Sequence, residues 1–135
     1  MPTEPTHPSR ALSVLVADDD FLVRRHTVVL LQQRGHSGVA VENGQQAIDC
    51  LATRSFDLVL LDIVMPVLDG LATLARLRRL EEQRTHGTHQ RIVMVTGHSE
   101  PGDRERLLKA GADGCIGKPF DAVTFRTELK RVMAM

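Results

Sequence analysis

Five short apolar segments recur along the chain and alternate with longer segments whose apolar residues have helical spacing. The apolar segments lie near residues 12–17, 37–42, 57–61, 91–96 and 113–117, and the helical ones near 20–34, 44–54, 70–82, 101–110 and 120–133. Short runs of Val, Ile and Leu without alternation are typical of parallel strands buried on both faces. The pattern predicts a single α/β domain of five βα units, with a parallel five-stranded sheet and helices on both faces.

Local signals at the ends of the helical segments agree with this layout. Asp20, Asn43 and Asp69 each precede a helical segment, where a short polar side chain can accept from the first free backbone amides. Gly35 and Gly111 follow helical segments, where a left-handed residue usually ends the helix. These five residues are therefore predicted to be helix caps.

Length and composition allow one domain. The chain has 135 residues, of which 42% are hydrophobic, enough for a core of modal domain size. Residues 1–11 carry three prolines and no periodicity, so we expect a disordered N-terminal tail followed by a single domain over 12–135. The first ten residues lack the hydrophobic segment of a secretory signal, which predicts a cytoplasmic protein.

The charge balance narrows the class of partner. Lys plus Arg and Asp plus Glu both number 17, so the chain lacks the positive excess that nucleic acid or an anionic membrane surface attracts. We therefore expect protein partners, with no direct nucleic acid contact and no membrane contact. Cys50 and Cys115 fit neither a metal-ligand spacing nor a disulfide-rich pattern and are predicted to be reduced thiols.

Polar side chains follow four of the predicted strands at the point where each strand ends. Asp18 and Asp19 follow the first strand, Asp62 the third and Thr96 the fourth, and Lys118 follows the fifth. In an open α/β sheet, ligands bind in the crevice beyond the carboxyl ends of the strands. Acids, a hydroxyl and a cation are thus predicted to meet at one edge of the sheet.

Three carboxylates in a small volume need a cation to neutralise them. Oxygen ligands without His or Cys favour Mg²⁺ or Mn²⁺ and leave coordination positions for water and phosphate oxygen. Helix capping alone would explain an acidic run such as 18–20. It does not explain Asp62, which ends the most apolar strand and is followed by another apolar segment.

A metal, an ammonium and a hydroxyl together supply what phosphoryl transfer needs, which is mainly positioning and stabilisation of charge on oxygen. A carboxylate can attack phosphorus to form an acyl phosphate, so Asp62 is the candidate nucleophile. Taken singly, Lys118 before Pro119 would be a solvated loop residue and Thr96 a turn residue. A cis peptide bond at Lys118–Pro119 would help to aim the ammonium inward.

Four motifs make the chain resemble the response-regulator receiver family. They are residues 14–20 (VLVADDD), 60–70 (LLDIVMPVLDG), 95–97 (VTG) and 117–120 (GKPF), and the resemblance covers roughly residues 12–133. The resemblance implies a flavodoxin-like (βα)5 domain with strand order 2-1-3-4-5. It also implies a two-component switch that accepts a phosphoryl group and is not an enzyme with its own substrate.

The resemblance assigns roles to individual residues. Asp62 is expected to accept a phosphoryl group from a histidine kinase or a histidine phosphotransfer protein, while Lys118 and Thr96 contact the phosphoryl oxygens. The groups expected to hold Mg²⁺ are Asp18, Asp19, Asp62 and the backbone carbonyl of Val64. The surface of the last two helical segments and the strand between them is where receivers often dimerise, so a homodimer through this face is expected.

Four positions depart from the family pattern, one of which is Gly117, next to Lys118, where a bulkier residue is usual. Receivers commonly carry Tyr or Phe three residues before the lysine as a switch, and here that residue is Cys115. Side chains two residues after the phosphoacceptor and after the threonine often control how water reaches the acyl phosphate, and here they are Val64 and His98. Val64 cannot orient water, so we hypothesise that His98 and access to the site set the lifetime of the phosphoryl group.

Other functions fit the sequence less well. A haloacid dehalogenase phosphatase needs a second Asp where this chain has Val64, and the acids at 18–20 would repel the phosphate of a bound flavin. Cys115 motivates one alternative, a receiver-like module that docks without phosphorylation. A second alternative is the receiver part of a hybrid sensor kinase. His86 and His89 lie in a polar segment that is predicted to be a surface loop and not a metal site.

Overall fold

The computed structural model describes residues 11–84, 88–97 and 101–135. Its strands are β1 (Ser13–Ala17), β2 (Ser37–Val41), β3 (Leu58–Asp62), β4 (Arg91–Thr96) and β5 (Gly114–Gly117), and its helices are α1 (Phe21–Gln33), α2 (Gly44–Thr53), α3 (Gly70–Glu82), α4 (Asp103–Lys109) and α5 (Ala122–Met133). The expected tail over residues 1–11, apart from its last residue, and the residues His86 and His98 lie outside the described residues. Within the described part, each helix is too short or too polar to cross a membrane.

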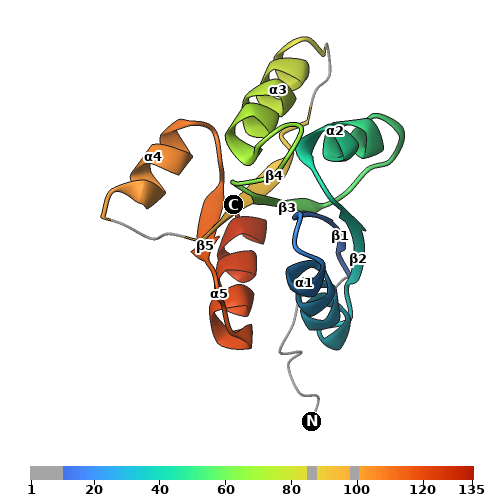
Figure 1. Ribbon diagram of the computed structural model, residues 1–135, viewed down its shortest axis with the longest axis vertical. Helices are drawn as coiled ribbons and strands as arrows, with labels where there is room; N and C mark the ends of the chain where they lie inside the picture. Colours follow the sequence, from blue (N-terminus) through green and yellow to red (C-terminus); the bar gives the residue numbers. More distant parts are fainter. Residues whose placement is uncertain (1–10, 85–87, 98–100) are drawn as a thin grey trace.

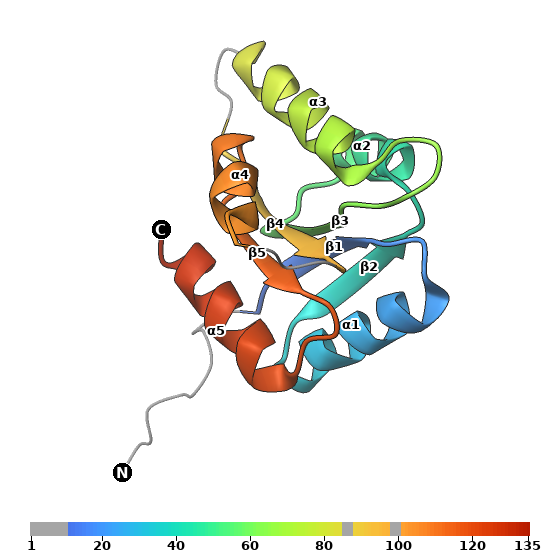
Figure 2. The ribbon, with the colours of Figure 1, turned by 60° about the vertical axis from the view of Figure 1, so that its left-hand side comes forward.

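The five strands form one parallel sheet in the order β2-β1-β3-β4-β5, which confirms the flavodoxin-like order implied by the resemblance. Figures 1 and 2 show α1 and α5 on one face of the sheet and α2, α3 and α4 on the other. The edge strands are β2 and β5, and β1, β3 and β4 lie between them.

Buried side chains fill both faces of the sheet because successive residues of a strand point to opposite sides. In β1, Val14 and Val16 pack in the layer beneath α1 and α5, whereas Leu15 and Ala17 pack in the layer beneath α2, α3 and α4. β3 is buried at all five positions, as the unalternating run predicts. β2 is mostly half-buried or exposed, because it has a strand on one side only.

The helix caps are confirmed. The side chain of Asp20 accepts from the amides of residues 22 and 23, that of Asn43 from residue 46, and that of Asp69 from residue 72. Gly35 and Gly111 have φ of +82° and +115°, the left-handed region in which glycine is free of the Cβ penalty. α4 is shorter than predicted, because it begins only after Gly102, which is also left-handed with φ of +91°.

A buried carboxylate holds the opposite edge of the sheet together. Asp113, just before β5, accepts from the amide of Ile92 at 2.8 Å and from Arg78 at 3.0 Å. His89 lies 2.6 Å from the other carboxylate oxygen, with its side chain 55% exposed. The polar segment that was predicted to be a surface loop is therefore anchored to the sheet through His89.

Candidate functional site

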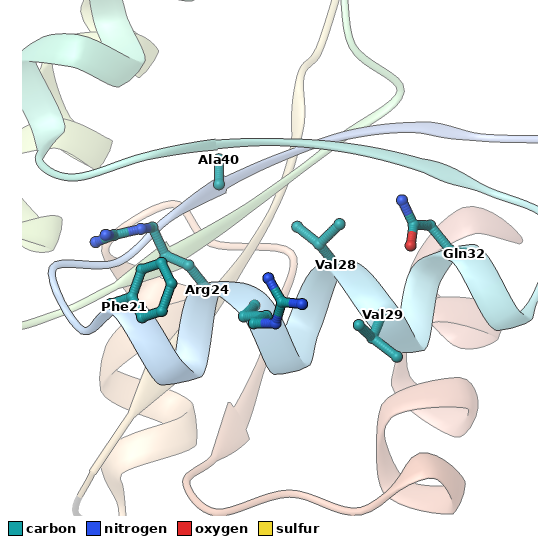
Figure 3. Close-up of a pocket in the computed structure, with 7 residues that line it drawn as sticks. Phe21, Arg24, Val28, Val29, Gln32 and Ala40 are labelled. Atoms are coloured by element: carbon teal, nitrogen blue, oxygen red, sulfur yellow. The ribbon is translucent and has the colours of Figure 1, made fainter.

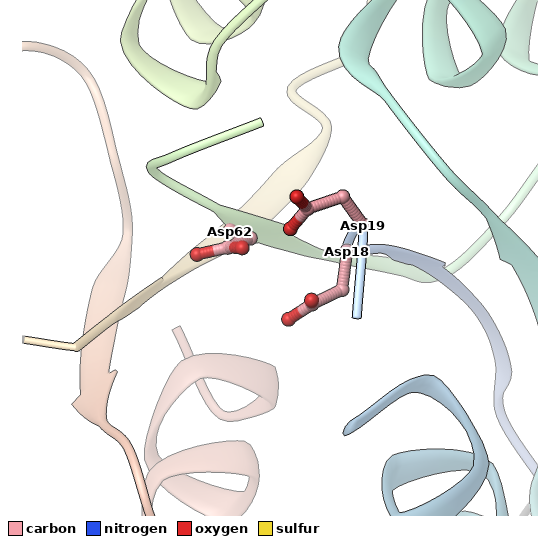
Figure 4. Close-up of side chains that lie close together, drawn as sticks. All are labelled: Asp18, Asp19 and Asp62. Carbon is pink, nitrogen blue, oxygen red and sulfur yellow. The ribbon is translucent and has the colours of Figure 1, made fainter. Parts of the chain in front are cut away.

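The acid cluster lies where two neighbouring strands end. β1 and β3 pair with Ala17 beside Leu61, so the residues that follow, Asp18 and Asp62, emerge side by side. One carboxylate oxygen from each of Asp18, Asp19 and Asp62 lies within 4.8 Å of the others, and Figure 4 shows the three side chains beyond these strand ends. Asp18 and Asp62 are buried, whereas Asp19 is exposed. The predicted juxtaposition of acids is therefore present, with one side open to solvent.

Lys118 bridges the two buried acids. Its Nζ lies 2.8 Å from Oδ2 of Asp18 and 3.1 Å from Oδ2 of Asp62. The Lys118–Pro119 peptide bond is cis, and the Lys118 amide donates to the carbonyl of Thr96 at 2.7 Å. Burial disfavours the ammonium, yet the hydrogen bonds that it donates to the two carboxylates, together with their negative charges, outweigh burial and raise the pKa of Lys118.

The surroundings of Asp62 disfavour its negative charge on balance. Burial, and after it the charge of Asp18, raise the pKa of Asp62, although Lys118 and the backbone N–H of Val64 favour its charged form. Three carboxylates and one ammonium leave two net negative charges at the site. Hard oxygen ligands with that net charge fit a divalent cation such as Mg²⁺, and the exposed side next to Asp19 leaves room for water ligands.

Thr96 completes the edge from the neighbouring strand. It is the last residue of β4 and is buried, and it follows Val95, which pairs with Asp62 in the sheet. Gly117 pairs with Thr96 on the other side, directly before Lys118. The hydroxyl and the ammonium thus come from adjacent strand ends, as the sequence predicts.

The residues expected to tune the site differ in their surroundings. Val64 is 75% exposed on the loop after β3. Cys115 is a half-buried free thiol, and burial raises its pKa although the charge of Arg104 acts in the opposite direction. His98, the third of them, lies outside the described residues.

Two glycines that sequence reasoning treated only as parts of motifs position the loop after β3. A Cβ on Gly70 would lie 2.1 Å from the carbonyl oxygen of Asp62, so only glycine lets the start of α3 pack on the backbone of the acid. A Cβ on Gly44 would lie 1.8 Å from the hydroxyl of Thr73, and the Gly44 amide donates to Leu68 at 3.1 Å. In the sequence, the Asp-Gly pair at 69–70 and the Asn-Gly pair at 43–44 indicate only turns or caps. The atoms that these glycines approach belong to residues outside the pairs.

The same loop holds a non-glycine residue in a left-handed conformation. Val67 has φ of +68°, which is rare for a β-branched residue, and its side chain is 80% exposed. The amide of Leu68 donates to the carbonyl of Pro66 at 2.7 Å, which closes a γ-turn around Val67, and a γ-turn with positive φ is rare and strained. The loop after β3 therefore stores backbone strain next to Asp62.

A hollow beside α1 contributes no group to the acid cluster. It is lined by Phe21, Arg24, Arg25, Val28, Val29, Gln32 and Ala40, as Figure 3 shows. Arg24, which lines this hollow, also supports the site, because its Nη1 donates to the backbone carbonyl of Asp18 at 2.8 Å. Sequence reasoning missed this support of the first acid, which depends on how the first turn of α1 folds back on the end of β1.

Comparison with known proteins identifies the family. The family model described as the response regulator receiver domain matches residues 14–130, which include every acid, hydroxyl and cation of the site. The chain belongs to the response regulator receiver family. The match confirms the resemblance that the four motifs indicate.

Relatives of this receiver occur in proteins of different size. It is 37% identical to the sensor histidine kinase GacS of Pseudomonas protegens over 87% of this chain and 13% of that protein. It is 33% identical to the chemotaxis protein CheY of Halobacterium salinarum over 82% of this chain and 87% of that protein. The chain thus spans a small part of the sensor kinase and most of the chemotaxis protein.

A solved structure supports the likeness in three dimensions. The receiver domain of a sensor histidine kinase from Pseudomonas aeruginosa, which has a magnesium ion coordinated in its active-site cleft, superposes with a TM-score of 0.80 at 25% identity. The likeness covers 93% of this chain and all of that one. The fold of the present receiver and that of the magnesium-bound domain are therefore the same.

Proposed function

We propose that Asp62 accepts a phosphoryl group in a Mg²⁺-dependent reaction and that this event switches a protein-docking surface. The observation that carries the proposal is the Lys118 ammonium, which lies within 3.1 Å of both buried acids in a site that keeps two net negative charges. A lysine that served only to neutralise an ion pair would not need a second and third carboxylate beside it.

The reaction follows from the positions of these groups. A carboxylate oxygen of Asp62 attacks phosphorus in line with the donor's leaving group, and the bond to that group breaks as the acyl phosphate forms. Mg²⁺, held by Asp18, Asp19, Asp62 and the backbone carbonyl of Val64, would reduce the repulsion between the acid and the incoming anion. Lys118 and the Thr96 hydroxyl then balance the charge on the phosphoryl oxygens.

Reversal of the switch depends on water. Val64 offers no polar group to hold a water, so we expect access past this exposed side chain and the imidazole of His98 to set the rate of hydrolysis. If a variant with both positions substituted hydrolysed its phosphoryl group at the wild-type rate, this part of the proposal would be wrong.

We propose a histidine kinase or a histidine phosphotransfer protein as the donor, and the cytoplasm as the compartment. The similarity to GacS supports a role as the receiver part of a hybrid sensor kinase, and the similarity to CheY supports a separate receiver. In both cases the domain is a phosphoacceptor that assists its own phosphorylation and dephosphorylation. A homodimer through α4, β5 and α5 remains part of the proposal.

A second candidate function is docking without phosphorylation, and Cys115 favours it because the usual aromatic switch is missing. Intact mass spectrometry after incubation with Mg²⁺ and acetyl phosphate separates the two. We expect a phosphoryl adduct that disappears with a chelator and in Asp62→Asn, but persists in the matched control Asp49→Asn, whose carboxylate lies on the exposed side of α2. If no adduct forms and the stable phosphoryl mimic beryllofluoride does not bind, docking without phosphorylation is the function that remains.

A further inference from the structure

The outer edge of β5 is covered by two side chains of opposite charge. The backbone amide of Cys115 donates to Oε2 of Glu128 at 2.9 Å, and its carbonyl accepts from Nη1 of Arg104 at 3.3 Å, so both groups are bonded to side chains and not to β4. Arg104 comes from α4 and Glu128 from α5, and Nη2 of Arg104 lies 3.2 Å from Oε2 of Glu128. The pair therefore satisfies an edge strand much as the backbone of a sixth strand would. We refer to Arg104 and Glu128 as the edge clamp.

The Glu128 half of the edge clamp is firmly built. Its side chain is only 10% exposed, and Nε of Arg131 donates to Oε1 at 3.0 Å while Nη2 of Arg131 donates to the carbonyl of Asp113 at 2.8 Å. A Cβ on Gly114 would lie 2.3 Å from Oε2 of Glu128, so a glycine is needed for the carboxylate to approach the strand this closely. Burial opposes charge on Glu128, but the hydrogen bonds and the two guanidinium groups outweigh it and lower its pKa.

The Arg104 half is the weaker one. Its side chain is 46% exposed, and its hydrogen bond to Cys115 is long at 3.3 Å. Because the guanidinium is partly solvated, it can leave at little cost, whereas Glu128 keeps Arg131 and the Cys115 amide as partners. A small movement of α4 therefore separates the edge clamp on the side of Arg104.

Arg104 and the strand residue that it contacts, Cys115, both lie close in sequence to residues of the phosphoryl site. Arg104 is the second residue of α4, the helix that follows Thr96, and Cys115 lies three residues before Lys118. In the sheet, β4 lies between β3 and β5, so movement of Thr96 toward a phosphoryl group on Asp62 is movement away from the β5 edge. If the start of α4 follows Thr96, Arg104 moves away from Cys115 and Glu128.

We propose that Arg104 is the switch residue of this receiver, in place of an aromatic side chain at position 115. The inference rests on the proposed phosphorylation of Asp62. When the phosphoryl site is filled, Arg104 leaves the edge clamp and the β5 edge opens between α4 and α5. Since coupling is reciprocal, the closed clamp also holds Thr96 back, and Arg104 is a positioning residue for the phosphoryl site.

The test compares two arginines of α4. Arg104→Met removes the edge clamp but keeps most of the aliphatic chain, while Arg106→Met removes an exposed arginine whose 2.7 Å ion pair is with Asp103 of the same helix. We expect Arg104→Met to take up phosphoryl from acetyl phosphate, and to bind beryllofluoride with Mg²⁺, about two- to fivefold better than wild type, the size of a coupling carried by one partly exposed pair. Arg106→Met should match wild type, and Arg104→Lys should lie between.

A spectroscopic readout keeps a structural effect apart from a coupling effect. The ¹⁵N–¹H signal of the Cys115 amide should move on addition of beryllofluoride and Mg²⁺, because its acceptor, Oε2 of Glu128, loses the ion pair with Arg104 when the edge clamp opens. In Arg104→Met without beryllofluoride, the signal should already lie part of the way along the same line. Thermal unfolding of both methionine variants checks that the fold is intact.

The outcomes separate the two proposals. If wild type binds beryllofluoride but Arg104→Met and Arg106→Met differ less than twofold, phosphorylation stands and the edge clamp is only structural. A Cys115 amide signal that stays unmoved when beryllofluoride binds would overturn the inference in the same way. If wild type binds no beryllofluoride and takes no phosphoryl group, the proposed function fails and the inference fails with it.

Discussion

Replacing the charge of Asp62 should make the receiver more stable while abolishing phosphorylation. In Asp62→Asn the side chain keeps its size, but the buried negative charge beside Asp18 and Asp19 is gone. At an effective dielectric constant of about 20, each repulsion within 4.8 Å costs about 3.5 kcal/mol or more, whereas the attraction to Lys118 at 3.1 Å returns about 5 kcal/mol. Solvent screens the repulsion from the exposed Asp19, which reduces the gain in stability. Removing the charge of Asp62 also removes the cost of burying it, which adds to the gain.

We therefore expect the free energy of unfolding to rise by about 1–2 kcal/mol in Asp62→Asn at neutral pH without added Mg²⁺. Urea unfolding, followed by circular dichroism, measures this difference. Asp49→Asn, a change of the same chemistry at an exposed position, should leave stability unchanged. Equal or lower stability of Asp62→Asn would mean that Lys118 fully compensates the buried acid and that the site is a satisfied ion pair.

The pH dependence gives the sign of the effect independently. The pKa of Asp62 is raised in the folded state, so the unfolded chain loses this proton first as the pH rises. Stability due to this group is then lost with increasing pH, starting near the unfolded value of about 4 and ending above the raised folded pKa. The advantage of Asp62→Asn should vanish below about pH 4 and should shrink when Mg²⁺ binds the wild-type acids.

Two further predictions concern the loop between β3 and α3. Gly70→Ala should destabilise the domain by about 2–4 kcal/mol and lower phosphorylation, because the new Cβ lies 2.1 Å from the Asp62 carbonyl oxygen and displaces the acid. The control for urea unfolding is Gly97→Ala, where a Cβ meets nothing within 4 Å. Equal unfolding midpoints of the two variants would contradict the packing argument. Val67→Asn should stabilise the fold by about 1 kcal/mol, since asparagine tolerates the positive φ, while Val64→Asn on the same loop should leave the free energy of unfolding unchanged. A loss of stability in Val67→Asn on thermal unfolding would show that the valine side chain packs after all.

The sequence by itself determined the elements and the edge of the sheet at which the site lies. An unalternating apolar run such as 58–61 is typical of a strand buried on both faces, and the caps at Asp20, Asn43 and Asp69 act within three residues of their partners. Once the strands are parallel, Asp18 and Asp62 must emerge at the same edge. The strand order came from resemblance to a family, because periodicity does not state which strands are neighbours.

Only the tertiary structure decided which distant residues support the site. In the sequence Gly70 is a typical turn residue, and only the structure shows that α3 packs on the Asp62 backbone at this position. His89 is a typical loop residue in the sequence, and only the structure brings it next to Asp113. The edge clamp joins Arg104 to Glu128 across 24 residues, and each alone is an ordinary helix-surface charge. Hydrophobic periodicity and capping are short-range and can be seen along the chain. The energies of these contacts depend on distances that exist only after the helices have packed on the sheet.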